Sequence, residues 1–308
     1  PVQCRAVSGG IIEMTDKRTE KICIFTDSAS DITHEEAERW DVQVAPLHVT
    51  VDDKTYLEYY EISPQEYWKM LEESETFPQT AQVGMEWFLN LYKQAHEDGC
   101  THCIGVLING SGSGTYQAAC ITRDMFYDEY GEDMTIELID SRCYSYTYGK
   151  VAVTGAKMRE EGKSFAEISA EMNSLVKGMK AYVGIYNLRI LRKSGRISGG
   201  AAFVGDALGL RPIAVVFDGS VDVMCKVRGD KAVANKLADL AAKDAVDKEH
   251  QTVRIMYGDV PEAQIQALED KLREKGFRDI ERSPLGIMVT SNTGPNALGV
   301  IFRGAPRA

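Results

Sequence analysis

The feature that most constrains the fold is an unbroken apolar run, Cys103 to Ile108, that leads directly into a glycine-rich turn. A strand without polar alternation is typical of a parallel sheet that helices cover on both faces. The turn, Asn109 to Thr115, has glycine at every second position, and a helical pattern follows it at once. Strand, tight turn and helix in this order predict a βα unit of a parallel α/β sheet.

The same order recurs through the first half of the chain. Short strand patterns occur at Ile22–Phe25 and Thr135–Ile139. Helix starts are predicted where a serine or threonine precedes a glutamate by three positions, or where a serine precedes a proline. Such starts occur at Thr33 with Glu36, at Ser63 with Pro64, and at Ser164 with Glu167. We therefore expect an α/β domain with a parallel sheet over residues 21–178, with an insertion at about 52–80 and an N-terminal extension over residues 1–20.

From residue 179 the pattern changes. Two apolar runs, Ile213–Phe217 and Val221–Val227, flank Asp218-Gly219, which predicts a β-hairpin. Four further elements are interpreted as helix, strand, helix and strand, in the order Lys231–Val246, Val253–Tyr257, Ile265–Gly276 and Ile287–Val289. This order predicts an α+β domain with a mostly antiparallel sheet over residues 179–308.

The composition narrows the classes of partner and location. The 308 residues are 44% hydrophobic and carry a formal net charge of −11. An acidic chain repels the phosphates of nucleic acids and of anionic lipids, so we expect no nucleic-acid partner. No run of about 18 apolar residues occurs, so we expect no integral membrane association. The cysteine count of seven is odd, and several cysteines lie in apolar runs, which favours reduced thiols in a cytoplasmic protein.

The glycine-rich turn is the strongest candidate for a ligand site. Glycines let the backbone N–H groups approach a ligand, the start of a helix adds free donors, and Ser113 and Thr115 add hydroxyl groups. This chemistry suits an oxyanion, although the pattern fits equally well a plain connection with a serine cap. The turn lacks the lysine of a nucleoside-triphosphate loop and the glycine spacing of a dinucleotide fold. We therefore expect no nucleotide and no other cofactor.

Two other patterns are given a structural interpretation. Cys100 and Cys103 have the C-x-x-C spacing of zinc or redox sites, but the second pair of a zinc site is missing. The Asp-Ser pairs Asp27-Ser28 and Asp140-Ser141 follow strand patterns at the edge where α/β sheets bind ligands. No nucleophile elbow accompanies them. We expect them to support the ligand loop and not to contact the ligand.

Six blocks, taken in order, resemble those of the DegV family. They are Phe25–Asp31, Gly112–Ala119, Ile139–Ser141, Leu188–Ile197, Leu210–Ile213 with Asp218-Gly219, and Thr293–Pro295. The resemblance covers about residues 21 to 303. It implies an α/β domain and an α+β domain with one long-chain fatty acid between them. In some family members a separate ATP-dependent fatty acid kinase subunit phosphorylates the bound acid, so the resemblance also implies such a partner.

The resemblance also implies which residues hold the carboxylate. Thr80 and Ser113 are the first candidates, and the remaining ligand-binding candidates are Gln82, Gly114, Thr115, Asn292 and Thr293. The basic residues Arg192, Lys193 and Arg196 are candidates for a partner-facing surface. The chain departs from the family at Ala81, Val83, Gly84, Asn292 and Asn296, and Asn292 stands where the family has histidine. Asparagine cannot carry a proton at neutral pH, which puts coupling to a kinase in doubt more than lipid binding.

Two other functions remain open. The first is an acyl or phosphoryl hydrolase that uses the Ser113 turn as an oxyanion cradle, although the sequence offers no obvious general base. The second is a lipid-responsive regulatory protein whose output is another protein. The leading hypothesis is a non-catalytic binding protein.

Overall fold

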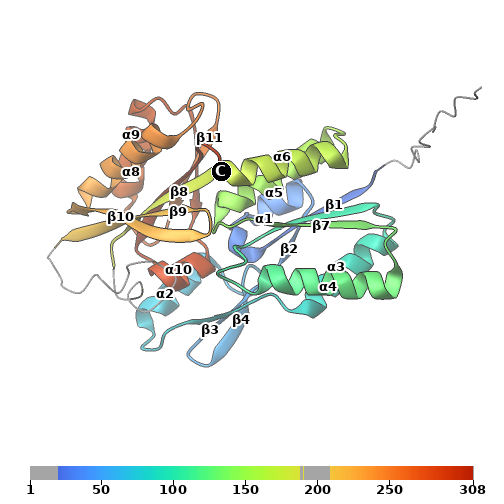
Figure 1. Cartoon of the computed structure of the whole chain (residues 1–308). Coiled ribbons are helices and arrows are strands. Elements are labelled where there is room, and N and C mark those ends of the chain that lie inside the picture. Colours follow the sequence, from blue (N-terminus) through green and yellow to red (C-terminus); the bar gives the residue numbers. More distant parts are fainter. Residues whose placement is uncertain (1–19, 188–189, 191–208, 308) are drawn as a thin grey trace, which may run out of the picture.

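The computed structural model describes residues 20–187, 190 and 209–307. Two domains lie side by side in it, the N-terminal one with strands β1, β2 and β7 and the C-terminal one with β8 to β11 (Figure 1). The predicted N-terminal extension up to residue 19 and the basic residues Arg192, Lys193 and Arg196 lie outside the described residues.

The N-terminal domain is built on a four-stranded parallel sheet in the order β2-β1-β6-β7. Helices α3 and α4 cover one face and α5 and α6 cover the other (Figure 1), which confirms the predicted architecture. The strands are β1 (Ile22–Asp27), β2 (Val42–Ala45), β6 (His102–Leu107) and β7 (Thr135–Asp140). The helices are η1 (Ser28–Ser30), α1 (His34–Arg39), α3 (Met85–Glu97), α4 (Thr115–Tyr130), α5 (Tyr146–Glu160) and α6 (Phe165–Gly178).

Residues between β2 and α3 form a small unit of their own. Strands β3 (His48–Val51), β4 (Lys54–Leu57) and β5 (Gln79–Ala81) make an antiparallel sheet in the order β4-β3-β5, and α2 (Pro64–Glu73) lies between β4 and β5 in the chain. The predicted helix starts are confirmed, because Thr33, Ser63 and Ser164 each form a capping box with the glutamate three positions on. Such caps satisfy N–H groups that the first turn of a helix would otherwise leave unpaired.

The C-terminal domain has a six-stranded sheet in the order β10-β9-β8-β13-β11-β12. All neighbours except β11 and β12 run antiparallel, so the mostly antiparallel sheet is confirmed. The strands are β8 (Met179–Ile185), β9 (Leu210–Phe217), β10 (Ser220–Arg228), β11 (Thr252–Tyr257), β12 (Asp279–Pro284) and β13 (Ala297–Arg303). The helices are α8 (Lys231–Asp244), α9 (Glu262–Glu274) and α10 (Ile287–Thr293).

One predicted element is wrong. The apolar run Ile287–Val289 is the first turn of helix α10, and the last strand is β13. The hydroxyl groups of Thr290 and Ser291 donate to the carbonyl groups four residues earlier, so they fit within the helix. A short apolar run has the same appearance in a buried strand and a buried helix turn, which is why the pattern misled.

The alternation of side chains along the C-terminal strands creates two cores. One face of the sheet, which includes Val183, Val216 and Ile301, packs into the same core as the N-terminal domain. The opposite face, which includes Tyr182 and Phe302, packs against α8 and α9. Successive residues of a strand point to opposite faces, so strands such as β8, β9 and β13 contribute to both cores. None of the helices in the described part of the chain is long and apolar enough to cross a membrane.

A buried ion pair also joins the two domains. Arg254 on β11 donates to both carboxylate oxygens of Glu36 on α1, at 2.7 and 3.1 Å, and its guanidinium lies 3.5 Å from the centre of the Tyr146 ring. Arg254 also donates to Glu281 on the neighbouring strand β12, at 3.1 Å from Nε. Burial alone would raise the pKa of Glu36, but the hydrogen bonds and charge of Arg254 lower it to about 2.

Candidate functional site

A cavity of about 420 Å³ lies between the two domains. Its volume falls within the range of roughly 300–1,000 Å³ that is usual for small-molecule sites. Most of its wall is apolar and comes from both domains: Ala29, Leu47 and Ile108 from the N-terminal domain, and Val183, Ile185, Ala214, Val216, Val221, Met288 and Val289 from the C-terminal domain. The cavity can therefore hold an apolar molecule that both domains contact.

Polar side chains enter the cavity wall from four segments. Strand β5 and its end supply Thr80 and Gln82, the glycine-rich turn supplies Ser113, and α10 supplies Asn292 and Thr293. The segment before α5 supplies Tyr144 and Ser145. These elements meet, because α10 packs against β5 and the Gln82 amide lies directly against Gly114. The structure therefore brings together six of the seven predicted ligand-binding residues, and Thr115 does not line the cavity.

The glycines of the turn are required for space. A Cβ atom at Gly114 would lie 1.8 Å from Oε1 of Gln82, and one at Gly112 would lie 2.1 Å from the hydroxyl of Tyr144. Both distances are far below van der Waals contact, so any larger residue would displace these side chains. The glycines thus let Gln82 and Tyr144 pack against the backbone on either side of Ser113.

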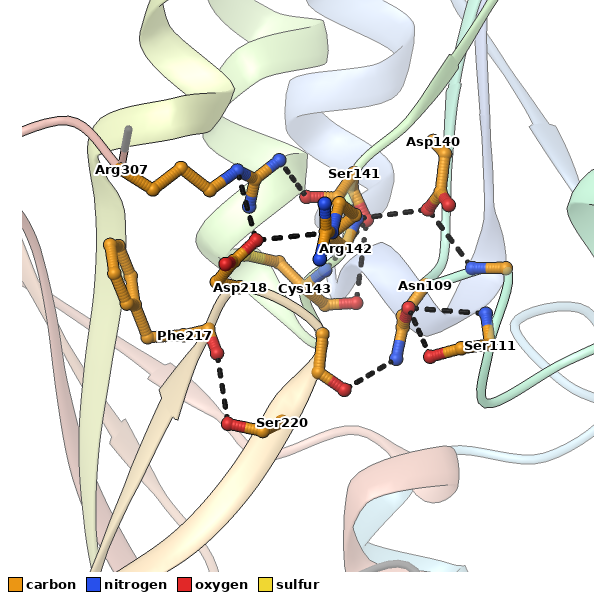
Figure 2. Close-up of polar contacts among 12 residues, drawn as sticks. Asn109, Ser111, Asp140, Ser141, Arg142, Cys143, Phe217, Asp218, Ser220 and Arg307 are labelled. Carbon is orange, nitrogen blue, oxygen red and sulfur yellow. Dashed lines mark hydrogen bonds and ion pairs between the residues drawn. The ribbon is translucent and has the colours of Figure 1, made fainter.

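Most N–H groups of the turn are already paired within the protein. The N–H groups of Gly112 and Ser113 donate to the carbonyl of Asn109, each at 3.0 Å. The N–H of Gly110 donates to Asp140 at 2.9 Å, and that of Ser111 donates to the Asn109 side chain at 3.2 Å (Figure 2). The N–H of Gly114 donates to no group among the described residues. The turn therefore offers a ligand the hydroxyl of Ser113 and few backbone donors.

Thr115 holds Ser113 in place. The hydroxyls of Ser113 and Thr115 lie 3.0 Å apart, and the Thr115 hydroxyl also accepts the N–H of Val83 at 3.3 Å. Thr115 is fully buried, so it acts on the site through Ser113 and the segment that follows β5.

Asn292 and Thr293 line the cavity, and each donates within the α10 segment. Nδ2 of Asn292 donates to the carbonyl of Met288 at 2.8 Å. The hydroxyl of Thr293 donates to the carbonyls of Val289 and Gly294, at 3.1 and 2.8 Å. The Asn292 amide has a second N–H and an acceptor oxygen, so α10 can both donate to and accept from a ligand.

Asp27 braces the strand that leads into the glycine-rich turn. Its carboxylate accepts the N–H of Ile108 at 2.7 Å and the hydroxyl of Tyr148 at 2.5 Å. Burial raises the pKa of Asp27 to about 6. The neighbouring Ser28 accepts the N–H of Leu47 at 2.9 Å, so this pair bonds to the backbone of two residues of the cavity wall, Ile108 and Leu47.

The second Asp-Ser pair has a similar arrangement. Asp140 accepts the N–H groups of Gly110 and Arg142, each at 2.9 Å, and so links the glycine-rich turn to the end of β7 (Figure 2). The hydroxyl of Ser141 accepts the N–H of Cys143 at 3.1 Å. Neither residue lines the cavity.

The sequence did not indicate a buried carboxyl at Glu58, which is only 3% exposed. It accepts the hydroxyl of Ser28 at 2.6 Å and the N–H of Met288 at 3.1 Å, and so connects η1 to the start of α10. Burial raises its pKa to about 8, and the charges of Asp31 and Asp27 act in the same direction. No local pattern marks Glu58, because its partners lie 30 and 230 positions away in the chain.

The carboxyls of Asp27, Asp31 and Glu58 form a cluster behind the cavity wall. Burial raises the pKa of Asp31 to about 7, and the hydroxyl of Ser145 donates to it. Asp31 and Glu58 also border a second cavity of about 470 Å³. The cluster therefore lies between two cavities, at the junction of η1, α5 and α10.

The surroundings of Cys100 and Cys103 do not form a metal site among the described residues. Cys103 is fully buried within β6, and its thiol lies 4.0 Å from the sulfur of Met134. In the part of the chain that the structure describes, no group of three or more histidine, cysteine, aspartate or glutamate side chains is arranged to hold a metal ion.

Comparison with protein families gives one clear match. The sequence model of the DegV family, described as uncharacterised proteins, matches residues 21–304. A DegV domain-containing protein of Clostridium acetobutylicum is 32% identical over 283 residues, which cover 92% of this chain and 98% of the relative. A second, from Caldanaerobacter subterraneus, is 30% identical over 284 residues, which cover 92% of this chain and 99% of the relative.

Solved structures give the same result. A DegV family protein of Thermus thermophilus, described by its fatty acid binding, has a TM-score of 0.81 and 27% identity over 92% of this chain and 99% of its own. A stearic acid-binding protein of Eubacterium ventriosum has a TM-score of 0.79 and 25% identity over 92% of this chain and 98% of its own.

Proposed function

This chain belongs to the DegV family, and from that premise we propose that it binds one long-chain fatty acid by its carboxylate in the cavity between its domains. The observation that carries the proposal is the make-up of the cavity wall, which is mostly apolar and carries a small set of polar side chains that includes Thr80, Gln82 and Ser113. A molecule with a long apolar body and one small anionic end matches such a wall. Fatty acids bound by the proteins of Thermus thermophilus and Eubacterium ventriosum support this choice of ligand.

The energetics favour such a ligand. Each CH₂ group that leaves water contributes about 0.8 kcal/mol, so an acyl chain supplies most of the binding free energy. A hydrogen bond to a charged carboxylate contributes roughly 1.5–3 kcal/mol. Hydroxyl donors at Ser113 and Thr80 would therefore fix the orientation of the acid and add a smaller part of the affinity.

A binding role is better supported than hydrolysis. A serine nucleophile needs a base within hydrogen-bond distance, and the nearest partner of the Ser113 hydroxyl is the hydroxyl of Thr115. No histidine is among the described residues that line the cavity. The arrangement of Ser113 suits a hydrogen bond to a ligand oxygen.

The second part of the proposal is that the chain presents the acid to a separate ATP-dependent kinase subunit, which forms an acyl phosphate. The resemblance to DegV proteins that work with such a kinase supports this step. Asn292 stands where those proteins have histidine, and its amide is bonded to the carbonyl of Met288. If that histidine assists phosphorylation, transfer to this chain is expected to be slower than transfer to a carrier that has it.

Native mass spectrometry of the purified protein tests the binding proposal. We expect a bound mass that matches a fatty acid, and its loss in Val221→Trp, which places a large side chain in the cavity. Met224→Trp is the matched control, because Met224 lies on the same strand but is 49% exposed. An empty wild-type protein that also fails to bind added palmitate or oleate would refute the proposal.

Ser113→Ala is expected to weaken fatty-acid binding by about ten-fold to a hundred-fold, because the carboxylate loses a charge-assisted hydrogen bond. Isothermal titration with oleate measures the change. Ser169→Ala serves as the control, since that hydroxyl bonds to Glu137 on the surface of β7. Equal affinities for the wild type and Ser113→Ala would remove Ser113 from the site.

Transfer to a kinase can be tested separately. The loaded protein is mixed with ATP and a purified fatty acid kinase catalytic subunit, and acyl phosphate is trapped as a hydroxamate. We expect hydroxamate to form slowly with the wild-type protein and faster with Asn292→His. No hydroxamate from a chain that holds its fatty acid would contradict delivery while leaving the binding proposal intact.

A further inference from the structure

The turn of the β9–β10 hairpin, Asp218-Gly219, lies against two loops of the N-terminal domain. The N–H of Gly219 donates to the carbonyl of Arg142 at 2.5 Å, and its carbonyl accepts Nδ2 of Asn109 at 3.0 Å (Figure 2). Asp218 and Gly219 both have positive φ, at 51° and 81°, as a tight two-residue hairpin turn requires. The backbone of this turn is therefore bonded to the glycine-rich turn and to the loop after β7.

Two arginines hold the carboxylate of Asp218. Nε of Arg142 lies 3.0 Å from Oδ1 of Asp218, and Nε of Arg307 lies 3.3 Å from the same oxygen. Arg307 also donates to the carbonyl of Ser141 at 3.3 Å (Figure 2), and its side chain is only 10% exposed. The end of the chain, the hairpin and the loop after β7 thus converge on one carboxylate.

The same hairpin forms one wall of the cavity. Ala214 and Val216 on β9 and Val221 on β10 line it, although Asp218 itself does not. Among the strands that the structure describes, β10 is at the edge of its sheet and pairs with β9 alone. A hairpin at a sheet edge can move with less loss of pairing than a central strand, so its position depends strongly on contacts made by its turn.

We propose that Asp218 is a positioning residue that acts as a latch: it holds the hairpin wall against the Ser113 turn and so limits how fast a ligand enters and leaves the cavity. The inference rests on the proposed fatty-acid binding. Asn109 connects the latch to the site, because it bonds to Gly219 and also to the N–H groups of Gly112 and Ser113. The latch makes no contact with the ligand, so it affects the rates of exchange more than the affinity.

Stopped-flow exchange of cis-parinaric acid, a fluorescent fatty acid, tests the latch. Asp218→Asn keeps the shape of the side chain but removes its charge, and we expect release to become about three-fold to ten-fold faster. Arg142→Gln should have the same effect from the opposite side of the ion pair. Association should accelerate as well, so the dissociation constant should change less than either rate.

Asp230→Asn is the matched control. Asp230 pairs with Arg211 at 2.6 Å near the other end of the same hairpin, and that pair lies within the C-terminal domain. Its removal should leave both rates at the wild-type value. Wild-type exchange rates in Asp218→Asn and Arg142→Gln, with both variants folded by circular dichroism, would overturn the latch.

The salt dependence of the wild-type protein gives a test that needs no variant. Asp218 and Arg142 are 40% and 53% exposed, so added salt screens their attraction. Release should accelerate as sodium chloride rises from about 0.05 to about 0.5 M, while release from Asp218→Asn should change little. Equal salt dependence in both proteins would also overturn the latch. A wild-type protein that binds no probe would instead refute the proposed function.

Discussion

Raising the pH from 5 to 8 is expected to lower the free energy of unfolding of this protein. Burial raises the pKa values of Asp27, Asp31 and Glu58 to about 6, 7 and 8, from ordinary values of 3.8, 3.8 and 4.5. Between each ordinary value and the raised one, the folded state binds more protons than the unfolded state. The contribution of these groups to the free energy of unfolding is therefore fully present below about pH 4, and it is lost as the pH rises toward 8.

The effect should be large enough to measure directly. A pKa difference of one unit corresponds to about 1.4 kcal/mol, so Glu58 alone would contribute on the order of 2–3 kcal/mol between pH 5 and pH 7. Urea unfolding at a series of pH values measures the slope. The charged groups that act on Glu58 are Asp31 and Asp27, both acidic, so they add to the slope and do not offset it.

Glu58→Gln isolates the contribution of one carboxyl. Glutamine imitates the neutral acid, can accept the N–H of Met288, and cannot ionise. We expect a flatter dependence of stability on pH in this variant. Glu73→Gln, a change of an exposed carboxyl on α2, should leave the slope unchanged. Stability that rises between pH 5 and pH 8 in the wild type, or equal slopes in wild type and Glu58→Gln, would rule out this account.

Arg254→Met is expected to lower the free energy of unfolding by about 3–5 kcal/mol. The substitution leaves Glu36 largely buried and without its partner, and it removes the guanidinium from the Tyr146 ring. Loss of a buried charge partner costs more than the pair contributes, because the remaining charge stays desolvated. Urea unfolding at pH 7 measures the loss.

A double variant distinguishes the effect of the Arg254–Glu36 ion pair from the effect of the other contacts of Arg254. In Glu36→Gln with Arg254→Met no buried charge remains unpaired, because the other carboxylate that Arg254 contacts, Glu281, is half-exposed, and glutamine can keep the capping box with Thr33. We expect this variant to be more stable than Arg254→Met alone. Lys163→Met, which breaks an exposed pair with Glu167, should change the free energy of unfolding much less, because solvent screens that pair. A double variant less stable than Arg254→Met would mean that Arg254 acts through contacts other than its ion pair with Glu36.

The parts of this structure that the sequence predicts are those governed by neighbours in the chain. The helix capping boxes at Thr33 and Ser164 depend on residues three positions apart, and the Asp218-Gly219 turn depends on two adjacent residues. The start of α10 depends on a carboxyl from another domain, since Glu58 accepts the N–H of Met288. The hydrophobic pattern of a seven-residue segment carries no information about such a contact, and here it predicts a strand.

In the candidate site too, the features set by neighbours in the chain were predictable and those set by distant contacts were not. The glycine spacing indicated a turn suited to an anion, and the turn lies on the cavity together with Ser113. The sequence could not indicate that side chains of Asp140 and Asn109 accept N–H groups of that turn, which leaves hydroxyls as its main donors. Nor could it indicate that one N–H of the Asn292 amide is bonded within its own helix. Both facts depend on the final positions of side chains and not on residue type.

The cavity between the domains has a consequence for the lifetime of the protein in a cell. Its walls belong to both domains, so a molecule inside it serves as part of the packing between them. A ligand that binds only the folded state raises the free energy of unfolding with its concentration. Copies without a ligand would open more often and be degraded sooner by proteases. The amount of this protein would then rise and fall with the supply of its ligand, without any change in the expression of its gene.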